Sequence, residues 1–183
     1  GTFALPICSL LALRWIGCPF PIPALGAVLT LPFLLNEGNS MWGGNIPSTL
    51  AGEFSHSLSF ALLVLFMGAL YRGIRERRHV GWCAVLFALT GLAHGYGMVI
   101  AAGLGLYFLT VTAEFRTTLL YLVRVYGVGG LLLGFWLIPL IWYLPYTSGF
   151  PMTWAFQSIL DIMPIILWPI LVIGAVTVGL VIW

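Results

Sequence analysis

The sequence predicts an all-α protein, a polytopic bundle of transmembrane helices with about seven membrane segments. Of its 183 residues, 61% are hydrophobic and only 7% are charged, and the mean hydropathy is +1.09. Soluble domains carry about 25% charged residues, so this composition does not suit a water-exposed surface. The apolar residues form continuous runs, whereas a membrane β-barrel shows short alternating segments. Helices are therefore expected, because each helix pairs its own backbone groups within the bilayer.

Seven apolar segments follow one another along the chain, at 3–13, 20–35, 54–71, 80–94, 97–113, 126–144 and 162–183. The fourth and fifth are separated only by HGYG. The fourth has 15 residues, which rise about 22 Å as a helix. This is less than a hydrocarbon core of about 30 Å, so these two segments form either a tight helical hairpin or a broken helix.

Two features of the later segments affect their boundaries. The stretch 113–124 either lies along the membrane interface as a short amphipathic helix or begins the sixth segment. Pro139 is expected to kink that segment, because proline removes one helix hydrogen bond. The chain starts at Gly1 and ends at Trp183 inside an apolar run. We expect residues 1–183 to be a single transmembrane domain and a segment of a longer chain.

The basic residues predict the orientation of the segments. All seven are arginines, and the seven-segment topology places them on one face, together with Glu76 and Glu114. The other face then holds Glu37, Glu53 and Asp161. This is the positive-inside pattern, so we expect a multi-pass protein of the cell (inner) membrane whose arginine-rich loops are cytoplasmic. The net charge of +2 is small and scattered, and we expect no nucleic-acid partner.

A polar, Gly-rich stretch, WGGNIPSTLAGEFSHS at 42–57, lies on the predicted outer face. Its residues 43–45 favour a tight turn, and Ser48 and Thr49 can cap a following helix. If that helix begins near Ser48, Glu53 and His56 share one face, one turn apart. A carboxylate and an imidazole at the membrane surface can hold a proton, bind a metal or bind a polar ligand.

Glu53 and His56 are therefore the candidate catalytic residues. The alternative is that Glu53 only favours the positive end of the helix dipole, while His56 hydrogen-bonds within the bundle. His94, at the outer end of the fourth segment, can approach Glu53 in space, although a packed histidine is again the alternative. Two histidines and a glutamate could ligate a divalent ion, but nothing in the sequence places the three together. No metal ligand is predicted, and the cofactor stays open between none and a divalent metal ion.

Three runs resemble, in order and spacing, stretches of bacterial multispanning proteins of the GT-C glycosyltransferase superfamily. They are GGNIPSTLAGEFSHSLSFAL at 43–62, LTGLAHGYG at 89–97 and GFWLIPLIWYLPYTSGF at 134–150. The branches they resemble are the arabinofuranosyltransferase-like proteins and the 6-pyruvoyl-tetrahydropterin synthase-related membrane proteins.

The resemblance implies an enzyme that takes a sugar from a polyprenyl-phosphate donor on the outer face of the membrane. Its partners would be membrane lipid, that donor and other membrane subunits. Glu53 and His56 would act in catalysis, and the substrate would be bound by Asn45, His94, Tyr96, Tyr146 and Thr147. Such enzymes use an acidic residue of the first outer loop, usually Asp, to deprotonate the acceptor or bind a metal. We expect that loop to lie upstream of Gly1, and residues 1–183 hold no matching Asp, which puts the catalytic base in doubt.

Two other functions are compatible with the sequence. The missing Asp favours a non-catalytic structural or assembly subunit of a larger membrane complex, built on a transferase-like scaffold. A transporter of a lipid-linked molecule fits the helix breaks at HGYG and Pro139, but no inverted repeat is apparent.

Overall fold

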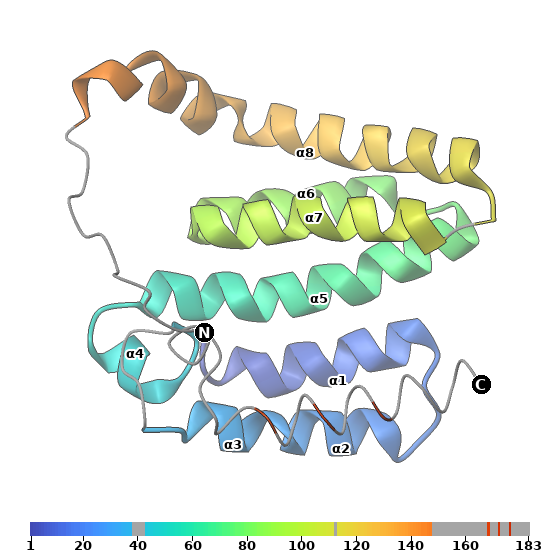
Figure 1. Ribbon diagram of the computed structural model, residues 1–183, viewed down its shortest axis with the longest axis vertical. Helices are drawn as coiled ribbons and strands as arrows, with labels where there is room; N and C mark the ends of the chain where they lie inside the picture. The colour runs from blue at the N-terminus through green and yellow to red at the C-terminus, as the bar shows by residue number, and fades with distance from the viewer. Residues whose placement is uncertain (38–42, 112, 148–167, 169–171, 173–175, 177–183) are drawn as a thin grey trace. The chain divides into compact units, whose positions relative to one another are not determined.

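The computed structural model describes residues 1–37, 43–111 and 113–147, together with Trp168, Val172 and Val176. Every element that these residues form is helical, which confirms the predicted all-α class for this part of the chain (Figure 1). The elements are α1 (Ala4–Ile16), α2 (Ile22–Val28), α3 (Thr30–Leu34), α4 (Ile46–Leu50), α5 (Phe54–Glu76), α6 (Val80–Ala93), α7 (Gly95–Val111), α8 (Phe115–Trp142) and the 3-10 turn η1 (Leu144–Tyr146). The chain divides into two compact units, Gly1–Tyr143 and Leu144–Trp183; α1 to α8 belong to the first.

Two of these helices are long and apolar enough to cross a membrane. They are α5, with 23 residues, and α8, with 28. The other apolar helical stretches have 10–17 residues; the 14 residues of α6 rise about 21 Å, less than the hydrocarbon thickness of about 30 Å. By length and composition, the described residues thus contain two helices that could span a membrane, fewer than the seven segments predicted. Most of the predicted segment 162–183 lies outside the described residues.

The second predicted segment, 20–35, is two short helices rather than one. Helix α2 ends at Val28 and α3 begins at Thr30. Pro32 has no N–H to donate to the carbonyl of Val28, so the helical hydrogen-bond ladder is interrupted there. The hydroxyl of Thr30 donates instead to the carbonyl of Ala27, at 2.7 Å. The segment therefore breaks where proline removes a backbone donor.

Residues 113–124 begin a long helix, which decides between the two predicted alternatives. Helix α8 starts at Phe115 and packs against α6, burying Tyr121, Leu122 and Val125. A helix lying along the interface would not bury these side chains in the bundle. The same helix continues past Pro139 to Trp142, and the N–H of Tyr143 donates to the carbonyl of Pro139 at 2.9 Å.

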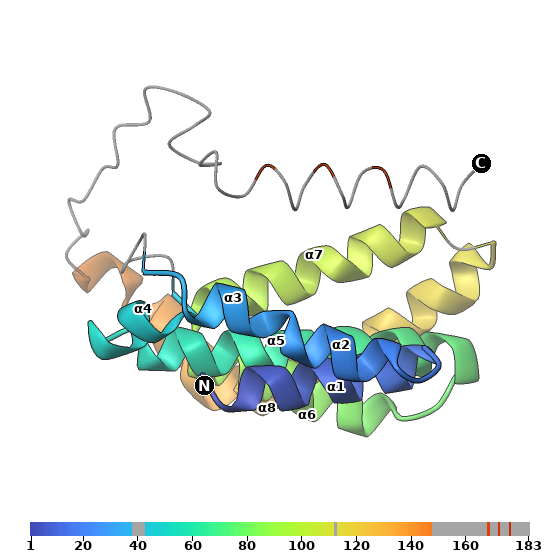
Figure 2. The same cartoon turned by 90° about the horizontal axis from the view of Figure 1, so that it is seen from below.

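Helix α5 is central to the first unit, because it packs against α1, α4, α6 and α7. Both views show α1 beside α5 and α2 beside α1 (Figures 1 and 2). The main core lies where α5 meets α6 and α8, and its fully buried side chains include Phe66, Leu70, Leu86, Val125 and Leu133. Aromatic rings fill this core edge to face, with Phe87 and Tyr126 at a centroid distance of 5.0 Å. Such pairs stabilise a core beyond their buried area.

Successive helices from α5 to α8 alternate in direction, and α1 runs the same way as α5, so the polar residues of the first unit lie at two opposite ends (Figure 1). The arginine-rich end joins the last turns of α1 and α5 to the first turn of α8. An ion pair links Arg77 to Glu114, and Arg14 lines a pocket with Arg72. The opposite end holds the Gly-rich turn, the start of α5 and the α6–α7 junction. The compartment that each end faces stays a prediction.

Candidate functional site

A short capped helix shapes the Gly-rich turn. Asn45 precedes α4, and its side-chain oxygen accepts the N–H of Ser48 at 3.0 Å, while its amide nitrogen donates to the carbonyl of Asn36 at 2.9 Å. The hydroxyl of Ser48 in turn accepts the N–H of Gly43 at 3.1 Å. Asn45 and Ser48 are fully buried. Asn45, rather than the predicted Ser48 or Thr49, is thus the cap of this helix. Its extended backbone directs its side chain toward the first backbone N–H groups of α4, which have no partner within the helix.

Helix α5 begins at Phe54, later than the expected start near Ser48. Gly52, with φ +116°, separates α4 from α5, a conformation that glycine adopts without strain. Glu53 immediately precedes α5, and its carbonyl accepts the N–H of Ser57 at 3.1 Å. Glu53 and His56 nevertheless share one face, as predicted. The carboxylate Oε2 of Glu53 lies 3.9 Å from Nδ1 of His56.

His94 reaches the same place from the break between α6 and α7. Its backbone is extended, with φ −163° and ψ 133°, which ends α6 and lets α7 start at Gly95. The hydroxyl of Ser59 on α5 donates to the carbonyl of Thr90 at 2.8 Å and, at 3.4 Å, to that of His94. The two imidazoles stack, with a centroid distance of 4.6 Å between His56 and His94 and an interplanar angle of 16°.

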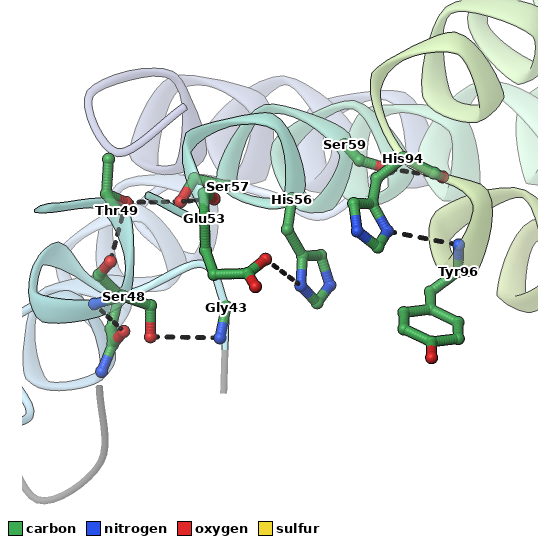
Figure 3. Close-up of polar contacts among 10 residues, drawn as sticks. Gly43, Ser48, Thr49, Glu53, His56, Ser57, Ser59, His94 and Tyr96 are labelled. Atoms are coloured by element: carbon green, nitrogen blue, oxygen red, sulfur yellow. Dashed lines mark hydrogen bonds and ion pairs between the residues drawn. The ribbon is translucent and has the colours of Figure 1, made fainter. Parts of the chain in front are cut away.

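Glu53, His56 and His94 together form what we call the acid–imidazole cluster. One ligand atom from each residue lies within 4.8 Å of the others, and all three residues are partly buried. In Figure 3, the carboxylate of Glu53 and the ring of His94 lie on either side of the His56 ring. Tyr96 borders the cluster, with its ring centroid 5.2 Å from that of His94, and is 70% exposed.

Two glycines allow the backbone to lie close to this cluster. A Cβ atom added at Gly43, whose φ is +74°, would collide with the imidazole of His56. A Cβ atom at Gly97 would collide with the hydroxyl of Ser59. Side chains at these positions would therefore displace either a ring of the cluster or the hydroxyl that holds His94.

The cluster has two chemical capabilities. A carboxylate beside an imidazole can orient the ring and take up a proton from a substrate. Two imidazoles and a carboxylate can also ligate a divalent ion. Both capabilities need the ligand atoms to lie close together, and one ligand atom from each residue lies within 4.8 Å of the others.

The other predicted site residues have different surroundings. Tyr96 lies beside the cluster, whereas Asn45 is buried in the cap of α4 and its polar atoms hold that turn. Tyr146 and Thr147 belong to the second unit; Tyr146 is 84% exposed, and the hydroxyl of Thr147 donates to the carbonyl of Leu144 at 2.7 Å. Substrate binding by any of these residues stays a prediction.

Three residues that position the cluster were not predicted from the sequence. They are Gly43, which contacts His56, Ser48, which accepts the Gly43 amide N–H, and Ser59, which supports His94. Ser59 carried one signal, a hydroxyl on an otherwise apolar helix face, where a buried hydroxyl needs a hydrogen-bond partner. Its partner lies 35 residues away, so the pairing was not visible in the sequence.

Comparison with known proteins supports the membrane class. The chain matches, over residues 2–183, the family model described as a 6-pyruvoyl-tetrahydropterin synthase related domain, a membrane protein. No curated protein and no solved structure matches it. The match agrees with one of the two branches that the sequence motifs resemble. Since it covers nearly the whole chain, this protein belongs to the 6-pyruvoyl-tetrahydropterin synthase related domain family of membrane proteins.

Proposed function

We propose that the protein is the core of an integral membrane glycosyltransferase of GT-C type that uses a polyprenyl-phosphate-linked sugar, with the acid–imidazole cluster as its site. The observation that carries the proposal is the meeting of Glu53, His56 and His94, with ligand atoms within 4.8 Å of one another. These are three of the ionisable residues that the family resemblance assigns to such a site. They lie at the end of a 23-residue apolar helix, where a lipid-linked substrate would present its polar head.

The reaction sets requirements that this site can meet. The acceptor hydroxyl loses a proton, its oxygen bonds to the anomeric carbon, and the bond from that carbon to the phosphate oxygen breaks, so that polyprenyl phosphate leaves. We propose that Glu53 and His56, whose Oε2 and Nδ1 atoms lie 3.9 Å apart, act on the acceptor hydroxyl or the leaving phosphate. Glu53 is the acidic residue of the cluster, and we propose it in this role.

The surroundings of the cluster suit a lipid-linked donor. Phe54 and Leu58 on α5 and Val99 on α7 are 68%, 42% and 65% exposed. Apolar side chains that remain exposed beside a polar site favour an apolar ligand or the bilayer itself. We propose that the prenyl chain lies along such surfaces, while His94 and Tyr96 contact the sugar or phosphate. Asn45, Tyr146 and Thr147 remain proposed contributors to substrate binding.

The proposal is tested by sugar turnover in membranes that contain the full-length protein. The probe is a radiolabelled polyprenyl-phosphate sugar, and the variants are Glu53→Gln and His56→Ala. We expect each to lower turnover about 100-fold or more, the range of acid–base contributions. His79→Ala is the matched control, because His79 lies at the arginine-rich end, 3.3 Å from Glu76. Full turnover in both cluster variants would remove the cluster from the reaction and favour the structural-subunit alternative.

A further inference from the structure

We propose that the acid–imidazole cluster binds one divalent transition-metal ion, of the zinc type, through Glu53, His56 and His94. The inference names a cofactor for the site described above. Any role of the ion in sugar transfer rests on the proposed function. Binding of the ion can be measured whether or not the protein transfers a sugar.

The ligand types select the class of ion. Two imidazole nitrogens and one carboxylate oxygen form the His2Glu set that occurs in catalytic zinc sites, where a fourth position is left for water or substrate. Imidazole suits zinc, iron, nickel and copper, whereas magnesium and calcium prefer sites made of oxygen atoms. The set therefore favours a first-row transition metal over the alkaline earths.

The geometry is close to what such an ion needs. Zinc bonds of about 2.0–2.1 Å in a tetrahedral site place ligand atoms about 3.4 Å apart. Here, Glu53 Oε2 and His56 Nδ1 are 3.9 Å apart, and the set of three stays within 4.8 Å. The side chains of His56 and Glu53 are 21% and 35% exposed. To bind one ion, the two stacked imidazoles must turn so that a nitrogen of each aims at the same point as Glu53 Oε2. The partial exposure of the site leaves room for a water or a substrate as the fourth ligand.

The backbone positions of the three residues also suit a metal site. Glu53 and His56 are three residues apart at the start of α5, a spacing that also supplies paired metal ligands in helical bundles. The third ligand, His94, comes from a separate helix break that the Ser59 hydroxyl holds against α5. The backbones of the three ligands are thus held close together, and only the side chains need to turn for an ion to bind.

One contact must change when the ion binds. Nδ1 of His94 now accepts the N–H of Tyr96, at 3.3 Å. Coordination through Nε2 would leave the ring hydrogen on Nδ1, and this long contact would be given up. The ring would then need an acceptor for that hydrogen, which water can provide at this partly exposed position.

The ion would also resolve a charge problem of the proposed reaction. Phosphate sites commonly use arginine, but in the seven-segment topology all seven arginines lie on the face opposite the cluster. A divalent ion held by the cluster supplies positive charge where the donor phosphate would lie.

Zinc binding by the purified full-length protein tests the inference. The protein is stripped of metal with a chelator, dialysed against Zn²⁺ alone, and its zinc content is measured by mass spectrometry. We expect one ion for each chain, and an affinity at least about 10-fold lower for Glu53→Gln, His56→Ala and His94→Ala, since even indirect supports of a metal site contribute 10–100-fold. His79→Ala should bind like the wild type. The inference would be overturned if the wild-type protein retained no zinc. It would also be overturned if His79→Ala lost as much zinc as the three cluster variants.

Two further measurements keep the result specific. Circular dichroism and gel filtration check that each variant folds, and His94→Gln replaces His94→Ala if the latter does not. Bound zinc with no sugar transfer supports this inference and contradicts the proposed function. Full transfer by zinc-free protein supports the proposed function and overturns this inference.

Discussion

At the scale of single residues, the approach of Gly43 to His56 is the contact most sensitive to substitution. Gly43→Ala would add a Cβ atom where the His56 ring now lies, at a φ of +74°. We expect this variant to displace the ring and to lower zinc affinity and turnover at least about 10-fold, as for loss of a ligand's support. The measurement is zinc content at equilibrium, together with turnover of the polyprenyl-linked sugar.

Gly52→Ala is the matched control for Gly43→Ala. Gly52 also has a positive φ, of +116°, but no described atom lies within 4 Å of an added Cβ. Alanine in a left-handed conformation costs roughly 1–2 kcal/mol in either place. The two variants should therefore lose similar stability on thermal unfolding, while only Gly43→Ala loses zinc. Equal zinc binding by both would show that the Gly43 contact does not position His56.

The buried hydroxyl of Ser59 gives a second residue-scale prediction. Ser59→Ala removes the donor to the carbonyls of Thr90 and His94. The N–H of His94 still donates to the Thr90 carbonyl, at 3.1 Å, so we expect a loss of only about 1 kcal/mol in unfolding free energy. Zinc affinity should fall about 10-fold, because a supporting contact of a ligand is lost.

Ser55→Ala controls for this substitution, as the same change one turn earlier on α5 at a partly exposed position. Calorimetric titration with Zn²⁺ would report both variants. An unchanged zinc affinity in Ser59→Ala would mean that the packing of the α6–α7 break alone holds His94.

The sequence predicted which ionisable residues form the cluster better than it predicted the residues that hold them in position. Glu53 and His56 were expected on one helix face because their spacing is local. His94 was only a candidate to approach them, at the outer end of another segment, and nothing in the sequence placed the three together. The contact of Gly43 with His56 depends on how the turn folds back over α5. That fold is set by Asn45 and Ser48, whose hydrogen bonds join positions that no periodic pattern marks.

At the scale of elements, the close crossing of α1 and α5 depends on Gly68. A Cβ atom added at Gly68 would lie 2.5 Å from the Cα atom of Ala12. Backbone cannot move aside as the end of a side chain can. We expect Gly68→Ala to separate the two helices and to lower the unfolding free energy by about 1–3 kcal/mol, the usual range for overpacking. Thermal unfolding in detergent measures this loss.

The control for Gly68→Ala is Gly127→Ala on α8, where no described atom lies within 4 Å of an added Cβ. Alanine favours a helix by up to about 1 kcal/mol over glycine, so this variant should be as stable as the wild type or more stable. A destabilisation equal to that of Gly68→Ala would indicate a general intolerance of substitution rather than a close helix crossing.

Helices were predicted more accurately than the contacts between them. Six of the seven apolar segments coincide with described helices, because continuous apolar runs have few other structures in a bilayer. In α8, the four-residue spacing of Gly130 and Gly134 is typical of a close helix contact. It is Gly129, however, that is buried, with an added Cβ atom 2.6 Å from the ring of Phe87. Which glycine faces a neighbour depends on the rotation of α8 about its axis, and the nearly uniform apolar sequence leaves that rotation undetermined.

At the scale of the whole molecule, the arginines and the acid–imidazole cluster define two ends of the first unit. Helix α5 links them, with the cluster at its first turn and four arginines from position 72 to position 78. Its 23 residues span about 34 Å, slightly more than the hydrocarbon core. If α5 crosses the bilayer, the two ends must therefore lie in different aqueous compartments. The positive-inside pattern then predicts that the cluster faces away from the cytoplasm.

Cysteine labelling in intact cells tests this orientation. The native cysteines, Cys8, Cys18 and Cys83, are first replaced by serine. Single cysteines are then introduced as Ala51→Cys and Arg78→Cys, both at exposed positions on either side of α5. A membrane-impermeant maleimide should label Ala51→Cys at once and Arg78→Cys only after the cells are permeabilised. Labelling of both in intact cells would mean that α5 does not cross. The reverse pattern would place the cluster in the cytoplasm, where a donor presented on the outer face could not reach it, and the proposed transferase orientation would be wrong.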